Sequence, residues 1–292
     1  TGNVRTVPMG EQQNMAQKVK AVFNRIFGIR LRYRMLLVYI IGGALPIIII
    51  GLYLVHGIYN ILTEQAKSAE VTELDMTRRQ VEEMANTLVT VTKYFYFDPQ
   101  LEEIAAKQYT DYQEMVHDYR KYDSFLNYGS YYNNTIAWMN IYLTNDTIVS
   151  NSRFTKVTEE IEEEEWYALA KKKNGGALWR FCQVPSKDNR ALTLLRMLKT
   201  RRGGDVGVLA VYVRPDRFQT FLQERDCDTF VVLNGQTVVA GQEQGLYFEQ
   251  VAGLLPEMEK GQVQKNVMLD KQEYVMTCEN LPLVESEDYL QI

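Results

Sequence analysis

Few side chains in this sequence could act as catalytic bases or nucleophiles at a recognisable spacing. The chain has two histidines, His56 and His117, and neither lies in an H-E-x-x-H pair. The sequence also lacks a Walker-type phosphate-binding loop and a G-x-S-x-G nucleophile motif. With two histidines, the sequence offers few candidates for the catalytic base of a Ser-His-Asp triad. We expect no enzyme active site, no bound metal and no cofactor in this chain.

Two runs suggest a more specific chemistry but have simpler explanations. Gly203-Gly204-Asp205 begins like the GGDEF signature of diguanylate cyclases, yet Val206 and Gly207 depart from it, so we interpret the run as a turn. The acidic run from Glu159 to Glu165 could bind calcium. Such runs are more often the solvated face of a helix, which is our interpretation here.

Cysteine usage and charge exclude two further classes of protein. Cys182, Cys227 and Cys278 stand far apart, so they form neither a disulfide framework nor a metal-ligand spacing, and at most one bridge could form. We interpret them as buried thiols that behave as small apolar side chains. The net charge is −5, and the basic residues near the start have another explanation, so nucleic-acid binding is excluded on charge grounds.

The element that indicates where this chain is located in the cell is an uncharged apolar run, Met35 to Val55. At about 1.5 Å per residue it covers roughly 30 Å, the thickness of a bilayer's hydrocarbon core. The basic residues before it are Lys18, Lys20, Arg25, Arg30, Arg32 and Arg34, and the acidic residues after it are Glu64, Glu70, Glu73 and Asp75. This asymmetry predicts a transmembrane helix with a cytoplasmic N-terminus, and places everything after residue 56 outside the cell.

A cleaved signal peptide and a buried core helix are the alternatives to this transmembrane helix. A signal peptide has an apolar core of about 7–15 residues, whereas this run is longer, follows residues 1–34 and precedes no A-x-A site. A domain of this size seldom buries so long an uncharged helix on all sides. Pro46 is no objection, because membrane helices tolerate helix breakers.

A long helix is predicted to follow the membrane run, because residues 58–95 contain no proline and no glycine. The apolar stripe of this helix has heptad-like spacing: Leu74, Thr77, Val81, Met84, Leu88, Val91 and Phe95. The stripe could pack on the helix's own domain or associate with a second copy of the chain, and the sequence leaves both open.

Beyond this helix the pattern predicts an α+β domain organisation. Helices are expected from Asp98-Pro99, around residues 112–126, and over residues 159–175, 215–224 and 246–258. Strands are expected at 135–144, 147–150, 177–184, 190–200, 206–213, 229–233, 237–240, 262–269 and 273–278. Residues 147–150 should pair back on 135–144 as a hairpin, and Asn234-Gly235 should form a type I′ turn. The expected architecture is a long helix, a five-stranded antiparallel sheet and a smaller sheet of the same style.

Several of these segments together resemble the extracellular double Cache (PAS-like) region of bacterial membrane sensors, with the closest likeness to sensor histidine kinases of the YesM type. The residues that carry the likeness are Leu45-Pro46 with the following isoleucines, the long helix, Asn140 to Leu143, Trp166-Tyr167, Trp179 and Gly207 to Val213. The likeness covers roughly residues 30–292. It implies a membrane-distal sheet that holds a small-molecule pocket, followed in the whole receptor by a second membrane helix, a HAMP linker and a cytoplasmic kinase. We therefore expect this chain to be a fragment of a longer receptor.

The resemblance also implies a division of the chain. The expected parts are a cytoplasmic segment (1–34), the transmembrane helix (35–55), a long helix with a helical segment (56–134), a membrane-distal PAS-like Cache subdomain (135–224) and a truncated membrane-proximal one (225–292). The expected location is the bacterial cell membrane. The expected partners are a homodimer mate and, through the missing kinase, a cytoplasmic response regulator.

Some sensors of this family recognise free amino acids through an Arg two residues before a Trp-Tyr pair and an Asp on a later strand. Here Glu164 and, approximately, Tyr212 occupy those positions, so an amino acid would lose its charge-paired contacts. A neutral or sugar-like ligand, or a ligand-loaded binding protein, is favoured instead. The expected lining is Tyr142, Trp166, Tyr167, Trp179, Arg196 and Tyr212. Core packing is the alternative role for each aromatic residue, and an exposed ion pair is the alternative for Arg196.

Two functions follow from this sequence. The first is the ligand-sensing, signal-transducing input region of a sensor histidine kinase, with a chemoreceptor or a diguanylate cyclase as alternative outputs. The second is a non-signalling surface module anchored to the membrane.

Overall fold

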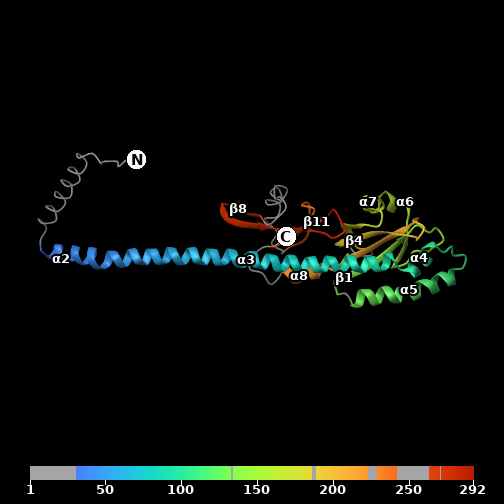
Figure 1. The fold of residues 1–292 in the computed structure, drawn as a ribbon, viewed down its shortest axis with the longest axis horizontal. Coiled ribbons are helices and arrows are strands. Elements are labelled where there is room, and N and C mark those ends of the chain that lie inside the picture. The colour runs from blue at the N-terminus through green and yellow to red at the C-terminus, as the bar shows by residue number, and fades with distance from the viewer. Residues whose placement is uncertain (1–30, 133, 186–188, 223–228, 242–262, 270) are drawn as a thin grey trace, which may run out of the picture. The chain divides into compact units, whose positions relative to one another are not determined.

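Figure 1 shows the computed structural model of the chain, which describes residues 31–132, 134–185, 189–222, 229–241, 263–269 and 271–292. The chain forms two compact units, Thr1–Ala69 and Glu70–Ile292. Helix α3 (Leu45–Tyr96) contributes residues to both. The predicted helix over residues 246–258 and Cys227 lie outside the described residues.

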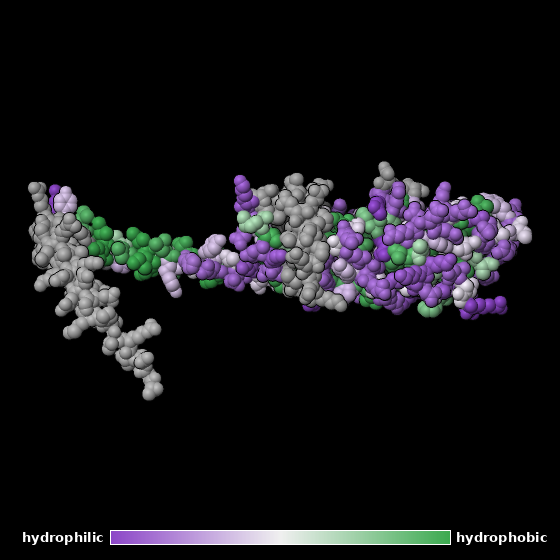
Figure 2. All heavy atoms as spheres, turned by 90° about the horizontal axis from the view of Figure 1, so that it is seen from above, coloured by the Kyte–Doolittle hydropathy of each residue, from purple (hydrophilic) through white to green (hydrophobic). Residues whose placement is uncertain are grey.

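The described part of the first unit consists of helical segments: α2 (Leu31–Tyr39), the π-helical turn η1 (Ile40–Ala44) and the start of α3. Pro46 has no N–H to donate, and its ring crowds the preceding turn. The π turn absorbs this irregularity, because the Leu45 N–H donates to the Ile40 carbonyl, five residues back. Within the described part of the chain, the helix from Ile40 is the one long and apolar enough to cross a membrane. The side chains of its most apolar 18-residue window are not covered by the protein (Figure 2).

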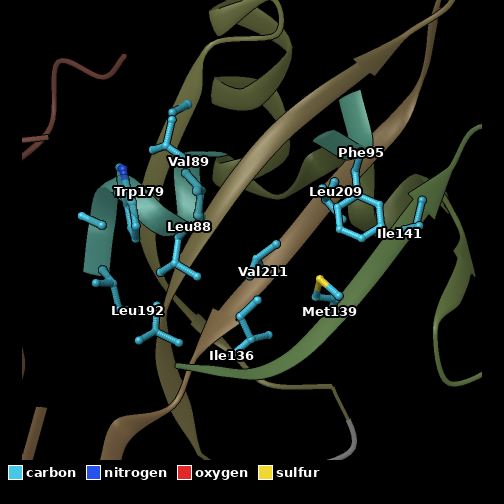
Figure 3. Packing of buried hydrophobic residues seen from close by; sticks show 14 of the residues in the cluster. Leu88, Val89, Phe95, Ile136, Met139, Ile141, Trp179, Leu192, Leu209 and Val211 are labelled. Carbon is cyan, nitrogen blue, oxygen red and sulfur yellow. The ribbon is translucent and has the colours of Figure 1, made fainter. Parts of the chain in front are cut away.

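The apolar stripe of α3 is buried within the second unit. Leu74, Val81, Leu88 and Phe95 are all buried, and the last two point into the core beside strand residues (Figure 3). The interpretation that the stripe packs on its own domain is therefore confirmed. A homodimer stays a prediction, and any contact that α3 made in it would have to use another face of the helix.

Two helices follow α3, as predicted: α4 (Pro99–Ala106) and α5 (Tyr112–Tyr132). Helix α4 begins at Pro99 because Asp98 caps it, with the Gln100 N–H donating to the Asp98 carboxylate at 2.9 Å. The other carboxylate oxygen of Asp98 accepts a 2.7 Å hydrogen bond from the Tyr122 hydroxyl, which ties α5 to the start of α4.

The main sheet has five strands in the order β2-β1-β5-β4-β3. The strands are β1 (Ile136–Leu143), β2 (Phe154–Lys156), β3 (Ala177–Gln183), β4 (Arg190–Lys199) and β5 (Asp205–Val213). All neighbours pair antiparallel except β1 and β2, which pair parallel. The five-stranded sheet is therefore confirmed, but it is mixed at one edge.

The predicted hairpin of residues 147–150 against β1 is wrong. This segment forms a turn and a loop, and the edge of the sheet is supplied instead by β2. The cause is Asn145, whose side-chain amide donates to the carbonyls of Ala105 and Lys107 while its oxygen accepts from the Thr147 N–H. These bonds turn the chain toward the end of α4, and Ile148 is buried in the core.

Residues 159–175 form two short helices rather than one. Helix α6 (Glu159–Glu163) and helix α7 (Glu165–Lys173) are separated by Glu164, whose backbone is extended. Helix α7 ends where Asn174 adopts a left-handed conformation, just before the predicted Gly175-Gly176 stop. The short helix α8 (Pro215–Leu222) follows β5, as predicted.

The C-terminal part contains two further sheets instead of one. The first has the order β10-β11-β6-β7, with β6 (Phe230–Leu233), β7 (Thr237–Gly241), β10 (Asn280–Pro282) and β11 (Tyr289–Gln291). The second is a separate hairpin of β8 (Val263–Leu269) and β9 (Gln272–Cys278). The sequence missed the short strand β10, because three residues carry no periodicity. Asn234 and Gly235 both have positive φ, as the predicted type I′ turn requires.

Alternation along the strands gives the main sheet two different apolar faces. One face packs under α3, α4 and α5 with residues such as Met139, Leu192 and Leu209 (Figure 3). The other face carries a separate cluster that α7 covers over β3 and β4. We call these the inner face and the outer face. The predicted α+β class, a long helix followed by antiparallel-type sheets, is confirmed.

Gly207 lies where β5 approaches the neighbouring strand too closely for any side chain. Its φ is +155°, and a Cβ built there would stand 2.0 Å from the Tyr142 carbonyl oxygen. The register also shifts at this point, between Leu198 and Lys199 of β4. Glycine is therefore required by a backbone contact.

We expect Gly207→Ala to lower the free energy of unfolding by about 3 kcal/mol, because the new methyl group would force β1 and β5 apart. Chemical denaturation of the full chain in detergent, followed by tryptophan fluorescence, measures this. Gly204→Ala is the matched control, since its Cβ would meet nothing closer than the Thr200 hydroxyl at 3.4 Å. Equal stability of the two variants would contradict the proposed contact.

Candidate functional site

The outer face of the main sheet carries a cluster of aromatic side chains from three elements. Tyr142 on β1 lies 5.1 Å from Trp166 on α7, measured between ring centroids, and Trp166 lies 5.7 Å from Tyr167. The hydroxyls of Tyr142 and Tyr212 are 3.1 Å apart. Tyr142 and Trp166 are half-buried, whereas Tyr167 and Tyr212 are buried. We call these four residues the outer aromatic cluster.

The sequence brings this cluster together through strand alternation and the break at Glu164. Tyr142 and Tyr212 share a face because β1 and β5 pair antiparallel, with Tyr142 opposite Val208. Glu164, extended and exposed, starts α7 so that Trp166 packs against the sheet and Ala170 is buried beneath the same helix. Each of these four residues was expected in the site.

Burial raises the pKa of the two buried tyrosines of the cluster, Tyr167 and Tyr212. Burial, and then the Tyr142 hydroxyl beside it, raise the pKa of Tyr212 far above its usual value. Burial also raises the pKa of Tyr167. The nearby Cys182 is a free thiol, and burial raises its pKa to about 11. The cluster therefore offers hydroxyls and aromatic faces, and the nearest anions are the carboxylates around it, such as Glu162 and Asp205, which also raise the pKa of Tyr167.

Trp138 is the residue of this face that the sequence analysis missed. It stands opposite Tyr212 in the β1–β5 pairing, and the Arg153 guanidinium lies 3.8 Å from the centre of its ring. Its indole N–H is buried and has no hydrogen-bond partner among the described residues. The signal was present, because Trp138 and Tyr142 alternate on one face of a strand. A buried donor without an acceptor is unusual in a folded protein.

Trp179 and Arg196 lie on the inner face, away from the outer aromatic cluster. The Trp179 side chain is fully buried with Leu88 and Val89 of α3 (Figure 3). Arg196 is 4% exposed and donates to the Thr92 hydroxyl, the Gly175 carbonyl and the Glu285 carboxylate. The sheet therefore separates the six expected residues into a group of four and a group of two.

The second candidate region is a hollow of about 250 Å³ between α5 and the loop before β2, which we call the second hollow. Its lining includes Tyr112, Met115, Asp123, Val149 and Arg153. Burial lowers the pKa of Arg153, and the Asp123 carboxylate, 3.6 Å from its Nε, opposes this. This hollow combines the buried Arg153, an exposed arginine, Arg120, one carboxylate, and walls of mixed polar and apolar side chains.

The other runs that the sequence singled out have ordinary roles in the structure. The glutamates between Glu159 and Glu165 are exposed, and no group of His, Cys, Asp or Glu among the described residues could hold a metal ion. Residues 200–204 form a turn closed by the Gly203 N–H and the Thr200 carbonyl, as expected. Asp205 pairs with Lys199 at 3.0 Å.

No protein-family model and no curated protein matches the sequence. Solved structures do match the fold. The extracellular domain of vpHK1S-Z8, a protein assigned as a histidine kinase, has a TM-score of 0.55 at 11% identity, covering 75% of this chain and 89% of that one. A domain of a protein assigned to the sensory box/GGDEF family of Vibrio parahaemolyticus has a TM-score of 0.53 at 9% identity, covering 75% and 91%. Methyl-accepting chemotaxis protein X has a TM-score of 0.52 at 13% identity, covering 76% and 95%.

These similarities establish the fold class of the chain. The long apolar helix followed by antiparallel-type sheets matches the Cache (PAS-like) fold of sensory domains. The three structures come from a protein assigned as a histidine kinase, a protein assigned to the GGDEF family and a chemotaxis protein. The fold therefore occurs in proteins with different signalling activities. The match therefore supports the fold that the resemblance implied, without distinguishing the YesM type of kinase.

The hydroxyl pair of Tyr142 and Tyr212 gives a direct test of the cluster geometry. We expect Tyr212→Phe to cost about 1 kcal/mol of unfolding free energy, and Tyr142→Phe in the Tyr212→Phe background to cost almost nothing more. A double-mutant cycle in chemical denaturation measures the coupling. Tyr112→Phe, at an exposed tyrosine, is the control. Additive effects of the two cluster substitutions would contradict the hydrogen bond.

Proposed function

We propose that this chain is the ligand-sensing input region of a transmembrane receptor. The observation that carries the proposal is helix α3. It is one continuous helix that begins in an apolar, uncovered stretch and ends buried under the inner face of a Cache-type sheet. A helix of this kind gives a sensor a covalent route from its core to a membrane segment.

The proposed ligand site is the outer aromatic cluster together with Trp138. Half-buried Tyr142 and Trp166 offer aromatic faces, Tyr212 offers a neutral hydroxyl, and Trp138 has a buried donor that lacks a partner within the described part of the chain. Aromatic faces and neutral hydrogen-bonding groups suit a neutral or sugar-like molecule. The exposed Glu164 and its acidic neighbours would repel a carboxylate approaching α7. These features favour a neutral ligand over a free amino acid.

For the output we propose a two-component sensor histidine kinase of the YesM type, acting on a cytoplasmic response regulator. This part rests on the sequence resemblance and on the match to the extracellular domain of vpHK1S-Z8. A chemoreceptor or a GGDEF-type cyclase is the alternative, because the fold occurs in both. The proposed location is the bacterial cell membrane, with a cytoplasmic N-terminus, an extracellular sensor and a homodimeric state. The membrane-distal and membrane-proximal subdomains, 135–224 and 225–292, belong to this proposal.

A ligand screen tests the proposed site. We expect at least one neutral sugar to raise the melting temperature of the full chain in detergent, in a panel that also contains amino acids and organic acids. Trp166→Ala should weaken that stabilisation at least roughly tenfold in ligand concentration, because one stacking face is lost. Stabilisation by amino acids alone would contradict the preference for a neutral ligand.

Tyr112→Ala is the matched control for this screen, because it removes an exposed aromatic residue from the second hollow and leaves the outer face intact. The response of this variant should equal that of the unsubstituted chain. If instead Tyr112→Ala lost the response and Trp166→Ala kept it, the ligand site would lie at the second hollow.

The topology can be tested by accessibility of single introduced cysteines. In intact cells, a membrane-impermeant maleimide should label Glu160→Cys, while Lys18→Cys should react only after the membrane is permeabilised. The unsubstituted chain measures background labelling. The reverse pattern would overturn the proposed orientation.

A further inference from the structure

The turn between β10 and β11 carries an unusual share of the charged contacts of the second unit. We call Leu283–Asp288 the clasp. The Leu283 N–H donates to the Asp288 carbonyl at 3.1 Å, and the Ser286 N–H donates to the Leu283 carbonyl at 3.2 Å. Glu285 has a φ of +60°, which a non-glycine residue seldom adopts. The clasp is thus a tight turn that projects its carboxylates outward from the C-terminal sheet.

Glu285 joins the clasp to α3 and to the main sheet at the same time. One carboxylate oxygen accepts a hydrogen bond from Nη2 of Arg196 at 2.9 Å, and the other pairs with Lys93 of α3. Arg196 extends this link, since its Nε donates to the Thr92 hydroxyl of α3 at 3.1 Å and its Nη1 donates to the Gly175 carbonyl at 2.7 Å.

Asp288 joins the clasp to the edge of the main sheet. Its carboxylate accepts hydrogen bonds from the Trp179 N–H and the Arg180 guanidinium of β3, each at 2.9 Å. It also accepts from the Asn234 amide of the β6–β7 turn at 2.9 Å. One buried carboxylate therefore covers the free edge of β3 and fixes the turn of the neighbouring sheet.

In the ion pairs between the C-terminal segment and the rest of the second unit, the two signs of charge come from different segments. The carboxylates come from the C-terminal segment: Glu279, Glu285, Glu287 and Asp288. The cations come from α3, α7, β3 and β4: Arg78, Lys93, Lys173, Arg180 and Arg196. Apolar residues beside them, including Leu283 and Leu290, belong to the main core cluster.

The burial of Arg196 makes this junction sensitive to a single change. A guanidinium that is 4% exposed depends on all of its acceptors, because leaving a buried charge unpaired is strongly unfavourable. An undocked clasp would remove the carboxylate from Arg196 and Lys93 together. The junction should therefore be formed completely or lost completely.

We infer that the clasp couples the last strand of the chain, β11, to α3 and the main sheet, so that these elements open as one cooperative unit. Only the purpose of this coupling rests on the proposed sensor function. In a sensor, a change in how the sheet packs on α3 would be transmitted to β11 through Glu285. The coupling itself is a property of the folded chain and needs no ligand.

Hydrogen exchange of the full chain in nanodiscs tests the inference, with Glu285→Gln as the variant. Amide protection should fall roughly tenfold or more, and together, in Tyr289–Gln291 and in residues 88–95 of α3. Glu287→Gln is the matched control, because Glu287 is 91% exposed and makes a single pair with Lys173. A loss confined to residues 283–288 would overturn the coupling, and so would equal effects of the two variants.

Two further measurements keep the test decisive if Glu285→Gln is poorly folded. Lys93→Met removes only the outer partner of Glu285 and should lower protection in the same two segments, by a smaller factor. The second measurement is the pH dependence of protection in the unsubstituted chain.

In the unsubstituted chain, Lys93 and Arg196 lower the pKa of Glu285 against the opposing effect of its burial. At Asp288, burial opposes ionisation, but hydrogen bonds from Ser286, the Trp179 N–H, Asn234 and Arg180 outweigh it and lower the pKa.

Because both pKa values are lowered by folding, the clasp's contribution to stability is complete above the usual carboxyl range and is lost as the pH falls through the folded-state values. After correction for intrinsic exchange rates, protection of the two segments should fall together in acid. Separate transitions would overturn the inference. The experiment uses no ligand, so a negative result would leave the sensor proposal to its own ligand screen.

Discussion

The fold of the second unit depends on burial of the apolar stripe of α3 beneath the inner face of the five-stranded sheet. Leu88 and Phe95 fill the space over β1 and β5, and the short helices close the sides of the same core. Burying a Leu or Phe side chain contributes about 1.5–3 kcal/mol, so a run of such residues fixes the helix on the sheet. Since α3 is continuous with the apolar stretch after Ile40, the same packing joins a helix long and apolar enough to cross a membrane to the core of the second unit.

Helix α3 and the short helices α4 and α5 cover the inner face of the main sheet, whereas the outer face carries a different set of side chains. The residues that alternate outward on β1 and β5 face away from α3, and they belong to the cluster packed against α7 and the segment before it. Aromatic side chains with hydroxyls gather there, and the Trp138 donor has no acceptor among the residues that the structure describes. The division between a fully packed face and a more lightly covered one places the proposed binding chemistry away from the structural core.

The charged contacts complement the apolar core in a distinct way. Apolar packing holds the C-terminal strands against the rest of the second unit, but it is non-directional. Glu285 and Asp288 add direction, because each accepts hydrogen bonds from defined donors on separate elements. The sheet edge at β3, α3 and the β6–β7 turn are thereby held in one geometry around the clasp.

The sequence by itself determined the elements and their faces: the uncharged run, the buried stripe of α3, the alternating strands and the Asn234-Gly235 turn all follow from local period and backbone preference. Tertiary structure decided the parallel pairing of β2, where Asn145 turns the chain toward α4. It also decided that Trp179 and Arg196 lie on the opposite face from Trp166. Alternation groups residues within one strand, but long-range packing chooses which face each element covers. The partners of Arg196 at positions 92, 175 and 285 are distant in sequence and meet only when the chain is folded.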